Sequence, residues 1–151
     1  MQDDLSSAQT TEAVHQLVVF HLGDEAYGID IFRVNEIIRL KEVTPVPGTQ
    51  PHIRGLINLR GKTIPVMDLR LRLGMESTEE TETSRIVVVN LEGESIGIIV
   101  DAVTEVLNLP ESELQTPPES VTGDGTEFIW CLAQRSGRIL TLLDLDQALA
   151  A

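Results

Sequence analysis

Residues 55–70 read Gly-Leu-Ile-Asn-Leu-Arg-Gly-Lys-Thr-Ile-Pro-Val-Met-Asp-Leu-Arg, and this stretch largely determines the fold that we expect. Apolar residues lie on both sides of a glycine, which predicts a β-hairpin that turns at Gly61. Asp68 follows as a favourable N-cap for a short helix. In that helix Leu69 and Leu73 would lie on one face, four positions apart.

The same pattern returns in the second half of the chain. A shift of 69 positions aligns the segments before the hairpin, and a shift of 76 positions aligns the hairpins themselves. The aligned positions include Leu17 with Ile86, Gly28 with Gly97, Gly61 with Gly137, and Asp68 with Asp144. We therefore infer two copies of one unit, at about residues 16–74 and 85–150.

Each copy contains two hairpins separated by a proline-containing loop. Between the hairpins of the first copy, Ile31, Val34 and Ile38 have helix-like spacing, so a short helix is expected there. Four or five short strands per copy suit a small closed barrel, which leaves no sheet edge exposed. Because the strands are apolar on both faces, the two barrels should pack around a shared aliphatic layer.

This pattern predicts four parts in the chain, which together make one domain. They are a disordered tail (residues 1–15), a first barrel (16–75), an exposed acidic linker (76–84) and a second barrel (85–150). The repeat does not reveal whether strands are exchanged between the barrels, so exchange stays open at this point.

The composition excludes several classes of protein. The 151 residues include 24 acidic and 11 basic side chains, and 42% are apolar, enough to form a core. No apolar run reaches the ~18 residues of a membrane span, and Met1–Thr11 lacks the features of a signal peptide, so a soluble cytosolic protein is expected. The window Arg33–Arg72 holds eight basic and three acidic residues (8 − 3 = +5). It is either a solvated basic face or a docking surface for an acidic partner.

We find no residue pattern that indicates catalysis. His15, His21 and His52 lie apart in unlike contexts, and no glycine-rich phosphate loop is present. Cys131 is the single cysteine and lies in an apolar strand, where a buried, inert thiol is expected. The sequence therefore favours a protein that is not an enzyme and that holds no metal or cofactor.

Positions that differ between the copies are freer to serve function than positions that both copies need to fold. The aligned pairs that differ include Arg60 with Ser136, Pro65 with Thr141, and Arg54 with Trp130. Arg60 lies at the tip of a predicted turn, where a rigid backbone can present its guanidinium group to a partner.

The motif Gly55–Gly61, followed by Ile64–Arg70, resembles the CheW family of chemotaxis coupling proteins. The segments Val18–Ile38 and Gly97–Leu107 fit the same family, and the resemblance extends from Leu17 to Leu149. It implies an all-β fold of two five-stranded Src-homology-3-like barrels, packed around a shared hydrophobic core, with short helices. It also implies an adaptor without catalytic activity.

The resemblance implies partners and a binding site as well. Proteins of this family couple the cytoplasmic tips of transmembrane methyl-accepting chemoreceptors to the regulatory domain of the histidine kinase CheA. This implies a cytoplasmic protein recruited to receptor arrays without inserting into the membrane. Carried over by position, the receptor-binding groove would comprise Ile31, Val34, Glu36, Ile37, Arg60, Val103 and Val106. The motif and turn positions would be Gly55, Asn58, Gly61, Pro65 and Asp68.

Three alternatives remain open. The chain could be a CheW-like adaptor of a non-flagellar chemosensory pathway, or the coupling domain of a larger CheA- or CheV-type protein. It could also be a nucleic-acid-binding barrel that uses the basic window. That last alternative is disfavoured because Arg33–Arg72 contains no aromatic residue on which bases could stack and the chain as a whole is acidic.

Overall fold

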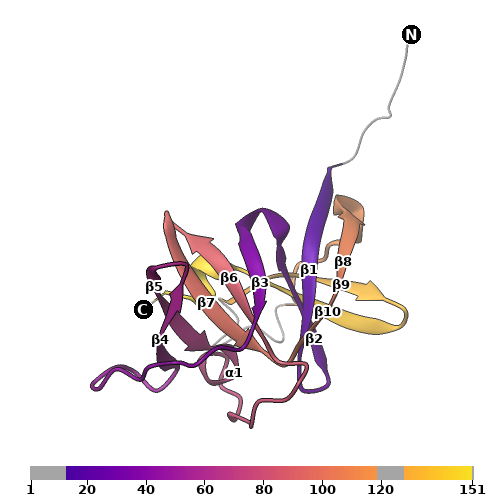
Figure 1. Cartoon of the computed structure of the whole chain (residues 1–151). Helices are drawn as coiled ribbons and strands as arrows, with labels where there is room; N and C mark the ends of the chain where they lie inside the picture. The colour runs from indigo at the N-terminus through magenta and orange to yellow at the C-terminus, as the bar shows by residue number, and fades with distance from the viewer. Residues whose placement is uncertain (1–12, 119–127, 151) are drawn as a thin grey trace.

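The computed structural model describes residues 13–118 and 128–150 and consists mainly of two five-stranded sheets (Figure 1). The first sheet contains β1 (Val14–Leu22), β2 (Glu25–Asp30), β8 (Ala102–Pro110), β9 (Ile129–Arg135) and β10 (Arg138–Leu143). The second sheet contains β3 (Val34–Arg39), β4 (Ile53–Leu59), β5 (Lys62–Asp68), β6 (Arg85–Leu91) and β7 (Glu94–Val100). The helical turns are η1 (Ile31–Arg33), α1 (Leu69–Arg72), η2 (Glu111–Glu113) and α2 (Leu145–Ala148).

Each sheet combines strands from both sequence copies. The strand order is β8-β1-β2-β10-β9 in the first sheet and β3-β6-β7-β5-β4 in the second. The internal repeat matches β1–β3 with β6–β8, and β4–β5 with β9–β10. The first hairpin of each copy therefore joins the last three strands of the other copy, and the exchange is reciprocal.

This exchange corrects the expected domain boundaries. Residues 16–75 and 85–150 do not form separate barrels, because β5 pairs in parallel with β7, and β2 pairs in parallel with β10. The tail is also shorter than residues 1–15, because Val14 and His15 already belong to β1 and pair with β8. Residues 1–12 lie outside the described part of the chain.

Within residues 13–118 and 128–150 the buried side chains form three apolar clusters, and the two sheets share the central one. In β1, Val18 and Phe20 face this central core, whereas Leu17 and Val19 face the interior of the first sheet. The central core also takes in residues of β5–β7, β10, α1 and α2. Both faces of β1 are therefore buried, and the prediction of a shared aliphatic layer is confirmed.

The segment that was expected to be helical is instead mainly a strand. Only Ile31–Arg33 forms a helical turn, and Val34–Arg39 pairs with β6 as strand β3. A β-bulge leaves Asn35 with no residue opposite it on β6, so Val34 and Ile37 face the same side although they are three residues apart. The helix was predicted from the spacing of Ile31, Val34 and Ile38, but Val34 and Ile38 lie on opposite faces of β3, because their partners Val89 and Ile86 belong to different apolar clusters.

The N-caps and hairpin turns match their predictions. Asp68 and Asp144 accept hydrogen bonds through Oδ1 from the third backbone N–H of α1 and α2, at 3.3 and 3.2 Å. Arg60 and Gly61 both have positive φ in a two-residue turn, as a type I′ hairpin requires.

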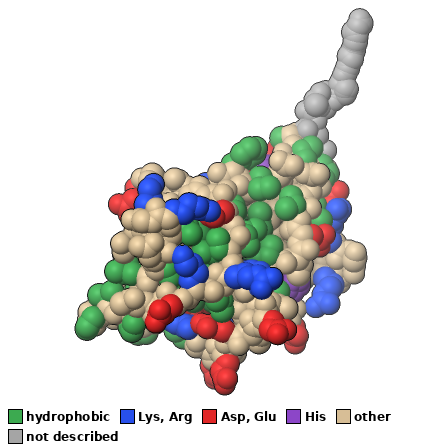
Figure 2. Space-filling view, viewed as in Figure 1, with side chains coloured by type: hydrophobic (Ala, Val, Ile, Leu, Met, Phe, Trp, Pro, Cys, Tyr) green, Lys and Arg blue, Asp and Glu red, His purple; other side chains and the backbone are tan. Residues whose placement is uncertain are grey.

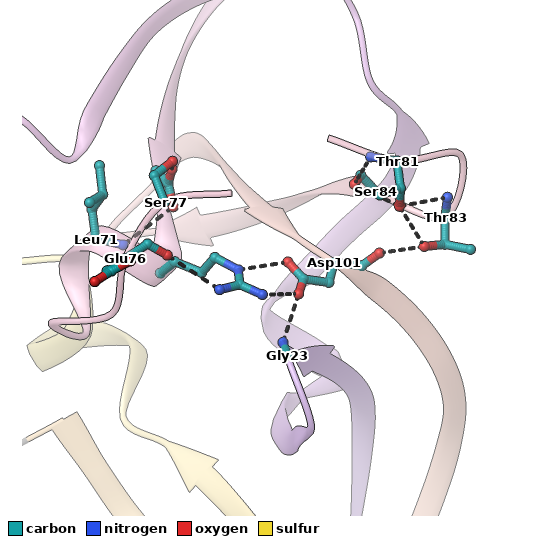
Figure 3. Close-up of polar contacts among 10 residues, drawn as sticks. Gly23, Leu71, Glu76, Ser77, Thr81, Thr83, Ser84 and Asp101 are labelled. Carbon is teal, nitrogen blue, oxygen red and sulfur yellow. Dashed lines mark hydrogen bonds and ion pairs between the residues drawn. The ribbon is translucent and has the colours of Figure 1, made fainter. Parts of the chain in front are cut away.

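A hydrogen-bond network joins the two copies near α1 (Figure 3). Asp101, between β7 and β8, accepts from Gly23 N in the β1–β2 turn at 2.7 Å and from Arg70 Nε on α1 at 3.0 Å. The hydrogen bond from Arg70 lowers the pKa of Asp101, although partial burial acts in the opposite direction. Three segments that are distant in sequence are thereby connected through one carboxylate.

Each sheet curves until its edges are linked by an additional bridge. Thr44 exchanges backbone hydrogen bonds with Leu56 of β4, and Gln115 does the same with Leu132 of β9. Gly55 permits the first approach, because a Cβ atom there would lie 2.1 Å from the Thr44 carbonyl oxygen.

No helix of the described residues is long and apolar enough to cross a membrane.

We predict that Gly55→Ala lowers the free energy of unfolding by about 3 kcal/mol or more. The new methyl group would combine a strained positive φ with a backbone clash. Gly48→Ala is the matched control, since Gly48 also has positive φ but a Cβ atom there would meet no other part of the chain within 4 Å, and it should cost about 1–2 kcal/mol. Urea denaturation measures both values, and equal losses would contradict the proposed steric role of Gly55.

Candidate functional site

The apolar residues predicted to bind a partner lie on β3 and β8, which are equivalent edge strands of the two sheets. Val34 on β3 lies opposite Val89 of β6, and Val103 on β8 lies opposite Phe20 of β1. Val89 and Phe20 both belong to the central core. Side chains of directly opposed residues share a face, so Val34 and Val103 border the same core from different sheets. Ile31 of η1 also packs against it.

Two further residues of the predicted set extend this surface into solvent. Ile37 lies opposite Val87, and Val106 lies opposite Val18. The two residues are 40% and 51% exposed. We call the combined surface the β3–β8 seam, which comprises Ile31, Val34, Ile37, Val103 and Val106. Figure 2 shows apolar side chains gathered on the face where β3 approaches the first sheet, with Lys and Arg side chains around them.

Glu36 and Arg60 form a bidentate ion pair beside the seam. Arg60 Nη1 and Nη2 donate to the two carboxylate oxygens of Glu36 at 2.5 and 2.7 Å. These hydrogen bonds lower the pKa of Glu36. Glu36 lies opposite Val88, so it projects from the face of β3 opposite to Val34 and Ile37. The pair therefore flanks the apolar seam without covering it.

Hydrogen bonds that involve Asn58 stabilise the backbone of the β4–β5 turn, which carries Arg60. Asn58 Oδ1 accepts from Gly61 N at 3.1 Å, and Lys41 Nζ donates to the Asn58 carbonyl oxygen. Asn90 makes the equivalent contact in the β6–β7 turn, where Glu92 also has positive φ. A turn fixed in this way holds the arginine backbone in one conformation.

Other predicted motif positions have structural roles. Gly55 admits the neighbouring loop at Thr44, as described above. Pro65 lies in β5 opposite Leu56, immediately before the residues that pair with β7. Asp68 is buried and accepts from Ser77 Oγ at 2.9 Å, in addition to capping α1.

Two aromatic residues, Trp130 and Phe32, are exposed although their exposure was not predicted from the sequence. Trp130 on β9 is 42% exposed, and Phe32 on η1 is 83% exposed. His15 contacts Trp130 edge to face, with ring centroids 5.2 Å apart. The aligned pair of Arg54 and Trp130 was the available signal, because the structural position is shared while the side-chain chemistry differs.

The titratable and nucleophilic residues do not assemble into a reactive centre among the residues that the structure describes. Cys131 is buried, and burial raises its pKa to about 11, so the thiolate is rare at neutral pH. His52 is buried as well, and its pKa is lowered by burial and by the nearby charge of Arg72. Within residues 13–118 and 128–150 no group of three or more His, Cys, Asp or Glu side chains could hold a metal ion.

The comparisons with known proteins agree with this arrangement. Residues 16–151 match the family described as the CheW-like domain. The chemotaxis protein CheW of Treponema pallidum is 35% identical over 136 residues, which cover 87% of this chain and 80% of that protein. CheW of Bacillus subtilis is 34% identical over 134 residues, covering 89% and 86%.

A solved structure has the same fold. The scaffolding protein TtCheW from Thermoanaerobacter tengcongensis superposes with a TM-score of 0.85 and 37% sequence identity, covering 92% of this chain and 94% of that one. The expected fold of two Src-homology-3-like units around a shared core is thereby confirmed. The chain belongs to the CheW-like family of chemotaxis adaptor and scaffold proteins, which are not enzymes.

Proposed function

We propose that this protein couples the cytoplasmic tips of transmembrane chemoreceptors to the regulatory domain of the histidine kinase CheA. It would act in the cytoplasm, at membrane-associated receptor arrays. The observation that carries the proposal is the β3–β8 seam, an apolar surface shared by two sheets and flanked by the Arg60–Glu36 pair. Membership of the CheW-like family supports the same role.

The shape of the seam favours an elongated apolar partner. Equivalent residues border it from the two sheets, Val34 with Val103 and Ile37 with Val106. An amphipathic helix that lies along such a surface can contact both strands through residues spaced by one turn. The apolar side chains supply the contact area, and Arg60 supplies a directed polar group at one side.

We predict that an aspartate in the seam weakens receptor binding about tenfold or more. Val34→Asp would place a charge among apolar groups, and Val106→Asp does the same at a position that is already half exposed. Ile139→Asp on β10 is the control, because Ile139 is exposed but lies outside the seam. Sedimentation with receptor-containing membranes measures binding, and circular dichroism verifies folding. Wild-type binding by a folded Val106→Asp protein would argue against the seam.

We also predict that Arg60→Ala or Arg60→His leaves the fold intact but lowers receptor-dependent kinase activation roughly tenfold in reconstituted arrays. Arg60 is 72% exposed at the turn tip, so its loss leaves no cavity. Lys62→Ala, a neighbouring exposed cation, is the control and should retain full activation. If an Arg60 variant activated the kinase fully, the functional assignment of Arg60 would be wrong.

The same variant has a structural readout that is independent of the partners. Without Arg60, the pKa of Glu36 should rise towards its ordinary value, which NMR titration of the side-chain carboxyl detects. A lowered folded-state pKa stabilises the fold above the ordinary carboxyl pKa, and this contribution is lost as the pH falls through the lowered value. The stability difference between wild type and Arg60→Ala should therefore shrink under acidic conditions.

A further inference from the structure

The repeat places α1 and α2 at equivalent positions in the two halves of the molecule. The segments that cover the N-terminal ends of these two helices differ. Near α1, the buried Asp68 carboxylate accepts from Arg54 Nη1 at 3.2 Å and from Ser77 Oγ at 2.9 Å. Glu80 then accepts from Arg54 Nη2 at 2.5 Å. The segment after α1 thus folds back over this region, and Figure 3 shows Ser77 next to Glu76 at the start of that segment. The cavity that remains there measures only about 10 Å³.

The equivalent region near α2 is less covered by the residues that the structure describes. The shift of 76 positions places Trp130 where Arg54 lies, and Asp144 where Asp68 lies. Asp144 Oδ1 caps α2 as Asp68 Oδ1 caps α1. A cavity of about 210 Å³ adjoins this cap, and we call it the α2 cavity. It is lined by Asp30, Arg33, Trp130, Leu143, Asp144 and Leu145.

The segments that precede β1 and β6 differ in their contacts. The segment before β6 covers the region around Asp68, whereas the described residues before β1 do not cover the α2 cavity. Before β6, a turn in which Ser84 N donates to the Thr81 carbonyl at 3.1 Å accompanies the fold-back. Before β1, the chain stays paired with the end of β8, because Glu111 N donates to the Ala13 carbonyl at 2.9 Å. The first described residues therefore continue alongside β8.

The lining of the α2 cavity suits an organic cation. Trp130 offers a partly exposed indole face, held by its edge contact with His15. Arg33 is already committed to Asp146 Oδ1 at 2.8 Å and to the Asn90 carbonyl at 3.1 Å. No hydrogen bond to Asp144 Oδ2 comes from the described residues, whereas the matching oxygen of Asp68 accepts from Arg54.

We propose that the α2 cavity is a docking site for an extended segment of a partner polypeptide that inserts an arginine side chain. The guanidinium group would stack on Trp130 and donate to Asp144, which reproduces in trans the contact that Arg54 makes with Asp68 in the other half. Arginine fits better than lysine, because its planar group both stacks and forms directed hydrogen bonds. The net charge of −13 also attracts a basic segment.

A titration with N-acetyl-Gly-Arg-Gly-amide tests the site on the full chain. Trp130 is the only tryptophan, so its fluorescence reports on the cavity directly. We expect a saturable change with a dissociation constant of about 1–10 mM, weakened by salt. The matched peptide contains citrulline, which keeps the shape of arginine but carries no charge, and it should bind about tenfold more weakly. Absence of saturation with the arginine peptide, or equal binding of both peptides, would overturn the proposal.

Two variants locate the bound peptide. Asp144→Asn keeps an oxygen that can cap α2 but removes the charge, and it should weaken binding about tenfold. Trp130→Arg should fill the cavity with the protein's own guanidinium group and abolish binding, as monitored by the Gln147 amide signal in NMR spectra. Ile139→Arg, which adds an exposed cation outside the cavity, should bind normally. A folded Trp130→Arg protein that binds the peptide as tightly as wild type would contradict the site.

Discussion

The parallel pairings of β5 with β7 and of β2 with β10 are the contacts on which the rest of the structure depends. Each joins strands of different sequence copies, and without it neither sheet would hold five strands. A unit of about 60 residues buries too little surface for a robust core of its own. The exchange of strands compensates for this small buried surface. The hairpin β1–β2 packs against the interior of its own sheet on one face and against the central core, which the two sheets share, on the other.

The same exchange explains where a partner could bind. It places β3 and β8 at equivalent edges of the two sheets, so Val34 and Val103 border one core from two sides. The repeat supplies this symmetric apolar surface, and departures from the repeat supply its asymmetric polar groups. The position equivalent to Arg60 in the second copy is Ser136, which carries no charge. The ion pair between Arg60 and Glu36 therefore has no equivalent in the second copy.

Local features were predictable from sequence, and long-range features were not. The turn at Gly61 and the cap at Asp68 depend on neighbouring residues, and both appear as expected. The pairing of β5 with β7 is not signalled by any turn residue, so the sequence left the exchange of strands open. The spacing of Ile31, Val34 and Ile38 predicted a helix, but pairing with β6, which is distant in sequence, makes Val34 and Ile38 part of strand β3. The positions of the seam came from the family resemblance, whereas the cavity at Trp130 required the structure.

The exchange of strands can be tested most directly by cutting the chain in the exposed segment between α1 and β6. Fragments 1–80 and 81–151 would be produced separately and examined by circular dichroism and ¹H–¹⁵N NMR. Each sheet needs strands from both fragments, so each fragment alone should be unfolded, and an equimolar mixture should recover the dispersed spectrum of the intact protein. Cooperative folding of either fragment by itself would contradict this account.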